Sequence, residues 1–294
     1  MRQISSCDFF YPLIEDPYLQ GKIAVANVLS DIYAMGVPHI DNVLMILGVS
    51  QMMKENEREV ITREMIRGFN DSCTEADTKV TGGQSVMNPW PMIGGTAIST
   101  VKEENVIYPY NIKPGDHLIL TKPLGTQVVV NTIEWMGKDN DLYKNISGLG
   151  ISNEEIWSMY SIAVESMARL NKKAAELMVK YKAHGATDIT GFGFYGHAKN
   201  LVEAQKKNME FVFHSLPLIR NTEEINNKVF NFGLIEGNSA ETSGGLLLAV
   251  SPEDSHKFIE EMIANNEDAW IVGSVKESEG KIISFEKEIN RIII

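Results

Sequence analysis

The sequence predicts an α/β protein built from two domains. Segments typical of strands and of helices alternate along most of the chain. The length of 294 residues is enough for about two domains, each with its own core. Two prolines, a glycine and a lack of periodicity interrupt the alternation at residues 108–116. We therefore expect an N-terminal domain at residues 1–109 and a C-terminal domain at residues 110–294.

The first domain is expected to begin with an aromatic-rich strand at residues 3–11, closed by Pro12. Pro17 suits the first turn of a helix and Gly36-Val37-Pro38 is a stop signal, so residues 17–35 are expected to be helical. The rest of the domain continues the alternation, with a strand at residues 42–49, a helix at 55–76 and strands at 78–81 and 92–101.

The second domain contains a long helical pattern. Apolar residues recur at steps of three and four from Ile156 to Tyr181, which predicts a single amphipathic helix. The other expected elements are strands at residues 210–213, 245–250, 269–275 and 281–285, and helices at residues 193–206 and 252–264.

Charge and hydropathy argue against several functional classes. The 27 basic and 39 acidic side chains give a net charge of −12, which repels nucleic acid and leaves open a small phosphorylated ligand held through divalent metal. The longest apolar runs are far shorter than the ~20 residues that cross a bilayer, so we expect no membrane span. The two cysteines, Cys7 and Cys73, cannot form a disulfide framework, which favours a reducing, cytoplasmic location.

The first candidate site lies on the helix at residues 17–35. Asn27 and Asp31 are one turn apart and share a face of a helix that is otherwise almost entirely apolar. A carboxylate on such a helix needs a partner. A bound metal ion is one candidate for that partner, and a paired side chain or a helix-end cap is the other.

Other candidates combine glycines with strand or helix ends. Asp188 precedes a Thr/Gly-rich turn into a helix, where backbone N–H groups could bind phosphate and the carboxylate could hold magnesium; Thr190 as a plain N-cap is the alternative. Residues 81–85 run from a strand into Gly82-Gly83, which suits either close approach to a phosphate or an ordinary hairpin turn. Residues 122–126 and 241–245 are similar but weaker candidates, and none of these segments matches a P-loop or GxGxxG motif.

The thiols and imidazoles are weaker candidates for chemistry. Cys7 is followed by Asp8, whose negative charge disfavours a reactive thiolate, so we expect a structural cysteine. The six histidines show no zinc-type spacing. His197 follows the Asp188 motif and could face a site, although a histidine packed within its helix is the commoner case.

In this order the motifs resemble one family, selenophosphate synthetase (selenide, water dikinase), of the aminoimidazole-ribonucleotide-synthetase-like superfamily. Thr126-Gln127 is similar to the eukaryotic branch, because bacterial forms usually have Thr-Gly there. The matching stretches are SCDFFYP at 6–12, ANVLSDIYAMGV at 26–37, VTGGQ at 80–84, LTKPLGT at 120–126, ATDITGFG at 186–193 and ETSGG at 241–245.

The resemblance implies a two-domain fold whose N-terminal sheet pairs with its twin in a homodimer. It implies a reaction in which ATP phosphorylates selenide and water completes the breakdown to AMP and phosphate, with Mg²⁺ as cofactor. It also implies specific roles: Asp31 and Asp188 as magnesium ligands, Asp8 as a contact to ATP or its metals, and Gly82, Gly83, Gln84 and Ser85 as nucleotide contacts from the partner subunit.

The family's glycine-rich N-terminal segment, with its selenide-site residue, a lysine and another metal-binding aspartate, has no counterpart in these residues. Cys7 matches a threonine of the family's Thr-Thr-Asp motif. We therefore assign no catalytic residue and expect this chain alone to be inactive. Two alternatives stay open: a non-catalytic regulatory or interaction homologue, and another ATP-using enzyme of the superfamily, such as thiamine-monophosphate kinase, against which the stretch at 27–37 argues.

Overall fold

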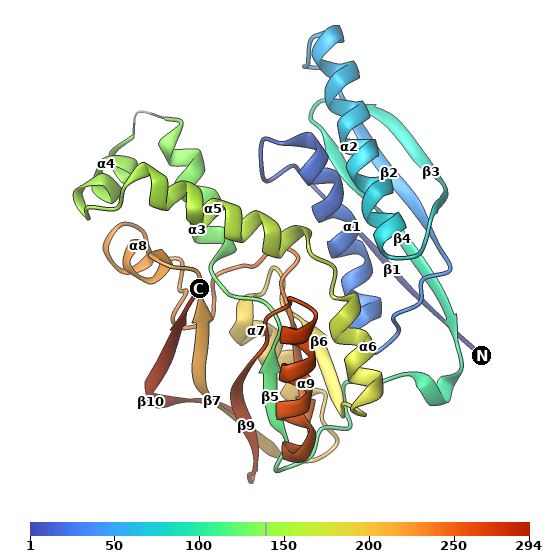
Figure 1. The fold of residues 1–294 in the computed structure, drawn as a ribbon, viewed down its shortest axis with the longest axis vertical. Helices are drawn as coiled ribbons and strands as arrows, with labels where there is room; N and C mark the ends of the chain where they lie inside the picture. Colours follow the sequence, from blue (N-terminus) through green and yellow to red (C-terminus); the bar gives the residue numbers. More distant parts are fainter. Residues whose placement is uncertain (139) are drawn as a thin grey trace. The chain divides into compact units, whose positions relative to one another are not determined.

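A computed structural model, which describes residues 1–138 and 140–294, divides the chain into two compact units (Figure 1). Unit 1 comprises Met1–Ile107 and Met167–Val179, and unit 2 comprises Tyr108–Ser166 and Lys180–Ile294. Each unit contains its own β-sheet and helices, so the predicted α/β class is confirmed. The first division between the units, after Ile107, lies close to the boundary expected at residue 109. Unit 1 also contains Met167–Val179, from the middle of the chain.

Unit 1 is a four-stranded sheet with strand order β1-β4-β2-β3. Strands β2 and β3 are parallel, and the other two neighbouring pairs are antiparallel. Between Met1 and Ile107 the elements are β1 (Arg2–Phe10), α1 (Pro17–Ala34), β2 (Asn42–Ser50), α2 (Glu55–Glu75), β3 (Val80–Asn88), β4 (Met92–Val101) and a 3₁₀ turn (Glu103–Asn105).

Helix α1 is held by its cap and by close contact with α2. The Asp16 carboxylate accepts a hydrogen bond from the Leu19 N–H (3.0 Å), and Pro17 occupies the first turn, as the sequence predicts. A Cβ on Gly21 would lie 2.2 Å from the Met65 carbonyl oxygen, and one on Gly68 would lie 1.8 Å from the Tyr18 carbonyl oxygen. The two helix backbones are therefore in direct contact.

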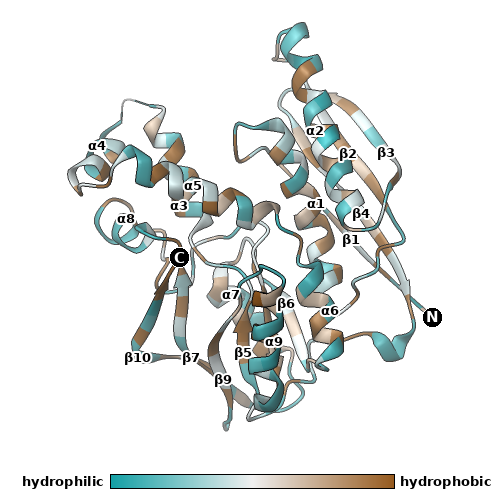
Figure 2. Ribbon diagram, viewed as in Figure 1, coloured by the Kyte–Doolittle hydropathy of each residue, from teal (hydrophilic) through white to brown (hydrophobic). Residues whose placement is uncertain are grey.

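The core of unit 1 consists of α1, the inner side of α2 and one face of the sheet. Almost all of α1 is buried, whereas α2 alternates between hydrophilic and hydrophobic residues along its length (Figure 2). Apolar burial of this kind contributes about 25 cal/mol per Å² and is the main term that stabilises the unit. Central members of the core are Leu29, Ile32, Leu47, Phe69 and Ile93.

Strand β3 differs from the expectation. Gly82 and Gly83 do not form a turn, because they lie inside the strand and pair in parallel with Leu44 and Met45 of β2. The hairpin interpretation of residues 81–85 is therefore wrong. Gly83 has a φ of +132°, and a Cβ there would lie 1.9 Å from the Met45 carbonyl oxygen, so the glycine permits a close strand pairing that other residues would prevent.

Unit 2 is a six-stranded sheet with strand order β10-β7-β9-β5-β8-β6. Only β10 and β7 pair in parallel among its neighbouring described strands. Its strands are β5 (His117–Leu120), β6 (Gly185–Asp188), β7 (Met209–Leu218), β8 (Leu246–Val250), β9 (Trp270–Glu277) and β10 (Lys281–Ile293). Its helices are α3 (Thr126–Met136), α4 (Asp141–Gly148), α7 (Gly193–Glu203), α8 (Thr222–Lys228) and α9 (Pro252–Ala264).

The single long helix expected between Ile156 and Tyr181 is wrong. The chain forms α5 (Asn153–Ala168) and α6 (Lys172–Lys180), with a break at residues 169–171. At the break, the Asn171 carbonyl accepts the Ala175 N–H (3.0 Å), and the Asn171 side chain donates to Ser30 Oγ (3.0 Å). The apolar spacing continues across the break because both helices bury one face. No helix of the described residues is long and apolar enough to span a membrane.

The geometry of β3 predicts unequal effects of two neighbouring substitutions. Gly83→Ala should lower the free energy of unfolding by about 2 kcal/mol or more, because it adds both backbone strain and a clash with β2. Gly82→Ala is the matched control, since its Cβ would meet only a Leu44 methyl carbon at 3.4 Å. Urea unfolding of both variants tests this, and equal destabilisation would contradict the register of β2 and β3.

Candidate functional site

Alternation along β1 determines which of its side chains face α1. Ile4 and Phe10 pack against the core of unit 1, so Ser6 and Asp8, which share their face, point the same way. Ser6 is buried and Asp8 is partly buried. Cys7 is exposed and belongs to the opposite face of the strand. Asp8 and Cys7 therefore do not face the same site.

Two hydrogen bonds join β1 to α1 and bring two carboxylates together. The Asn27 amide Nδ2 donates to Asp8 Oδ2 (2.6 Å), and Ser6 Oγ donates to Asp31 Oδ2 (2.8 Å). The Phe9 N–H also donates to Asp8 Oδ1 (2.9 Å). The structure thus brings together Asp8, Asn27 and Asp31, which the sequence had singled out in two separate motifs.

This arrangement favours a bound cation. Burial raises the pKa of Asp8 above its ordinary value, and the negative charge of Asp31 raises it further, while hydrogen bonds from the Phe9 N–H and the Asn27 amide lower it. A divalent cation would offset both the burial and the repulsion. Carboxylate and amide oxygens are ligands that Mg²⁺ accepts, and Mg²⁺ is commonly held by one or two carboxylates together with substrate phosphates.

The described residues do not form a complete metal site on their own. Among residues 1–138 and 140–294, no group of three or more His, Cys, Asp and Glu side chains is arranged to hold a metal ion. The Asp8 and Asp31 pair therefore fits a metal that takes its remaining ligands from a nucleotide or from water.

Asp31 is less enclosed than the sequence suggested. Helix α1 is almost entirely buried, as the sequence predicts. The expectation that Asp31 is buried with it is wrong, because the Asp31 side chain is exposed. Its charge keeps contact with solvent, and Ser6 provides one hydrogen bond, so burial alone creates no demand for a metal at this position.

Gly82, Gly83, Gln84 and Ser85 lie far from this pair within one chain. All four are exposed on β3, at one edge of the sheet, whereas Asp8 lies on β1 at the other edge. Strands β4 and β2 separate them, which corresponds to three spacings of about 4.8 Å. One copy of unit 1 does not bring the two sets of residues together.

In unit 2, backbone contacts gather the other candidate segments. Asp188 ends β6 and is buried, and the turn that follows leads into α7. The Glu241 N–H donates to the Thr190 carbonyl (3.1 Å), and the Gly244 N–H donates to the Ile189 carbonyl (3.1 Å). The segment at 241–245 thus lies against the segment at 186–193.

The start of α3 is already occupied by a carboxylate of the protein. Glu241 accepts hydrogen bonds from the Gly125 N–H (2.7 Å), the Thr126 N–H (2.9 Å) and the Thr126 hydroxyl. The possible phosphate site at residues 122–126 is therefore wrong, because its backbone donors have a partner. Burial raises the pKa of Glu241 to about 7, while these hydrogen bonds lower it. Because the same hydrogen bonds join the two segments, residues 122–126 and 241–245 form one buried structural network.

Thr190 and His197 form a local contact at the start of α7. Thr190 is not the N-cap, since Phe192 occupies that position. The Thr190 hydroxyl instead lies 3.0 Å from His197 Nε2, and His197 is buried. This contact gives His197 a hydrogen-bond partner in the turn before α7, which favours a structural histidine.

Sequence reasoning missed the role of Ser6 and the contact between Asn27 and Asp8. Strand alternation was a usable signal for Ser6, because residues two apart share a face. The pairing of Asn27 with Asp8 depends on how α1 lies across β1, and local sequence carries no such signal.

Comparison with known proteins agrees with this architecture. The AIR synthase related protein N-terminal domain matches residues 2–101, and the C-terminal domain of the same name matches residues 113–285. Thiamine monophosphate kinase from Aquifex aeolicus has a TM-score of 0.73 over 97% of this chain and 88% of its own, at 17% identity. The hydrogenase maturation protein HypE in complex with ATP has a TM-score of 0.72 over 97% and 82%, at 13% identity. The protein therefore has the two-domain fold of AIR synthase related proteins.

Comparison with relatives of similar sequence shows to which family within this fold class the chain belongs. The chain is 48% identical to selenide, water dikinase 2 of Mus musculus over 93% of its length and 61% of the relative's. It is 48% identical to selenide, water dikinase of Trypanosoma brucei brucei over 94% of its length and 71% of the relative's. The chain belongs to the selenide, water dikinase family. It spans about three fifths of the length of the mouse relative.

Proposed function

We propose that the protein acts in the ATP-dependent phosphorylation of selenide, with selenophosphate, AMP and phosphate as products. The family name carries this proposal, since a selenide, water dikinase has selenide and water as its two phosphoryl acceptors. The γ-phosphoryl group moves from the β-phosphate oxygen to selenium, and water then takes the β-phosphoryl group of ADP to give phosphate and AMP. Identity of 48% to the dikinases, against 17% to thiamine monophosphate kinase, favours this substrate class.

Asp8 and Asp31 are proposed to hold the phosphates of ATP through Mg²⁺, with Asp188 of unit 2 as a further magnesium ligand. The hydrogen-bonded pair on β1 and α1 supports this assignment. Bound Mg²⁺ would supply positive charge that offsets the repulsion between carboxylates and triphosphate. Asn27 fixes the orientation of the Asp8 carboxylate, and Ser6 fixes that of Asp31.

The group that handles selenide is proposed to lie outside these 294 residues. Cys7 is the natural suspect within them, but alternation along β1 directs it away from Asp8. A segment with a cysteine or selenocysteine and a lysine, as in the family, would complete the site. The exposed thiol of Cys7 and the buried thiol of Cys73, both unpaired, support a reducing, cytoplasmic setting.

A homodimer is proposed to complete the nucleotide site. Gly82, Gly83, Gln84 and Ser85 lie three strand spacings from Asp8 in one chain, and in the proposed dimer a second copy presents them to the nucleotide. The exposed edge strand β3 supports this, since it carries apolar side chains at Val86 and Met87 in contact with solvent.

A hybrid protein tests the proposed reaction. The residues that precede the matched region in the mouse relative are joined to Met1, and selenophosphate formed from ATP and selenide is followed by phosphorus NMR. We expect product from the hybrid and none from the 294 residues alone, because loss of each stabilising group costs ~3 kcal/mol or more of the transition-state free energy. Asp31→Asn in the hybrid should lower the rate at least about a hundredfold.

An inactive hybrid that still folds and binds ATP would contradict the proposed reaction and favour a non-catalytic homologue. Robust product from the 294 residues alone would show that a residue within them, Cys7 first, handles selenide.

Light scattering tests the dimer. At micromolar concentration we expect twice the chain mass of 32.8 kDa. Met87→Lys, which places a charge on the exposed apolar part of β3, should shift the protein towards monomer, whereas Val60→Lys on α2 should leave it dimeric. A monomer in the unsubstituted protein would contradict the proposal.

A further inference from the structure

A small cleft in unit 2 is lined by none of the residues assigned to ATP or magnesium. One wall is the extended segment after Tyr108, with Tyr110 and Lys113, and the other is the end of α7 and the turn into β7, with Lys206 and Lys207. Its volume is about 210 Å³. No carboxylate is among its lining residues, although the chain carries a net charge of −12.

The lysines of this cleft, Lys113, Lys206 and Lys207, differ from most others in the described part of the chain. Lysines elsewhere typically pair with carboxylates, as Lys228 does with Glu224 (2.7 Å) and Lys257 with Asp254 (3.0 Å). Lys206 Nζ instead lies 4.1 Å from the centre of the Tyr110 ring, and no carboxylate of the described residues pairs with Lys206 or Lys207. Three lysines thus line one cleft, and no carboxylate of the described residues forms an ion pair with Lys206 or Lys207.

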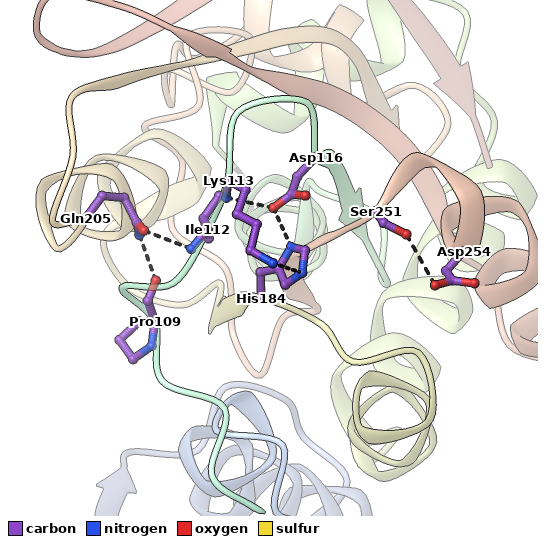
Figure 3. Close-up of polar contacts among 8 residues, drawn as sticks. All are labelled: Pro109, Ile112, Lys113, Asp116, His184, Gln205, Ser251 and Asp254. Atoms are coloured by element: carbon purple, nitrogen blue, oxygen red, sulfur yellow. Dashed lines mark hydrogen bonds and ion pairs between the residues drawn. The ribbon is translucent and has the colours of Figure 1, made fainter. Parts of the chain in front are cut away.

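Two hydrogen bonds of Gln205 fix the two walls relative to each other, as Figure 3 shows. Gln205 is buried next to Lys206; its Oε1 accepts the Ile112 N–H (3.1 Å), and its Nε2 donates to the Pro109 carbonyl (2.7 Å). One glutamine therefore clamps the segment that bears Tyr110 and Lys113 to the end of α7. The backbone segments that carry the three lysines are therefore fixed relative to each other before any ligand arrives.

Lys113 is positioned by a second set of contacts (Figure 3). Its backbone N–H donates to Asp116 Oδ2 (2.8 Å), which also lies 2.8 Å from His184 Nδ1. The carboxylate accepts, so the proton of His184 is on Nδ1 and its Nε2 accepts from Lys113 Nζ at 3.0 Å. The side chain of Lys113 is therefore held by an imidazole nitrogen and not by a carboxylate.

We propose that this cleft binds a small phosphate anion, inorganic phosphate or pyrophosphate. Lysine ammonium groups are point donors for phosphate oxygens, and three of them can surround a compact anion. The volume is below the ~300 Å³ at which sites for larger ligands begin. Tyr110 offers no free face for a base, since it stacks on Tyr108 (ring centres 5.2 Å apart) and carries Lys206. The site uses none of the residues assigned to ATP and goes beyond the proposed function.

Calorimetric titration of the full chain with pyrophosphate and, separately, with inorganic phosphate tests the proposal. EDTA is present so that the magnesium-dependent site is silent. We expect saturable binding that Lys207→Glu weakens by about tenfold or more, and that Lys206→Ala also weakens. Lys207→Arg, which keeps the charge, should bind within about threefold of the parent. The tighter of the two anions identifies the physiological size class.

Two control variants show whether the anion binds in this cleft. Lys287→Glu makes the same change of charge at an exposed lysine of β10 and should leave binding unchanged. Asp31→Asn should also leave it unchanged, so failure of the proposed ATP site does not affect the result. Absence of saturable binding, or equal weakening by Lys207→Glu and Lys287→Glu, would overturn the proposal.

Discussion

The direct contact between the backbones of α1 and α2 is the constraint on which unit 1 depends. There is no room for a Cβ at Gly21 of α1 or at Gly68 of α2, so at these positions the helices pack more closely than larger residues would allow. This contact holds α1 against the sheet, where its length is almost wholly buried. The position of α1 in turn determines that Asn27 reaches Asp8 and that Ser6 reaches Asp31.

The same protein presents two opposite electrostatic environments. On unit 1, Asp8 and Asp31 concentrate negative charge, and the raised pKa of Asp8 records the cost of placing it there. Phosphate can approach that pair only with a cation between them. On unit 2, Lys113, Lys206 and Lys207 line a cleft with no carboxylate among its lining residues, and phosphate could approach them directly. From these properties we expect phosphate binding to require a metal ion at the acidic pair and to need none at the lysine cleft.

Much of unit 1 could be predicted from local patterns, because its elements have clear periods and strong stop signals. The limits of α1 follow from Pro17 and from Gly36-Val37-Pro38. The break between α5 and α6 could not be predicted, since the apolar period continues across it and the hydrogen bond found at the break joins Asn171 to Ser30, which is distant in sequence. Of the two alternatives for the Gly-Gly pair in β3, the hairpin turn is wrong, because the glycines permit close strand pairing. The hydrogen bond of Asn27 to Asp8 and the hydrogen bonds of Glu241 to the start of α3 depend on packing between elements. Local sequence patterns therefore could not predict either of them.

The central claim is that the carboxylates joined to β1 and α1 bind nucleotide through a divalent cation. Calorimetric titration of the chain with ATP, with and without Mg²⁺, tests it most directly. The account predicts affinity at least about tenfold higher with Mg²⁺, and loss of that difference in Asp8→Asn and Asp31→Asn. The exposed control Asp268→Asn should keep it. Equal affinity with and without Mg²⁺ would contradict the account, because the acidic pair would then play no part in holding the phosphates.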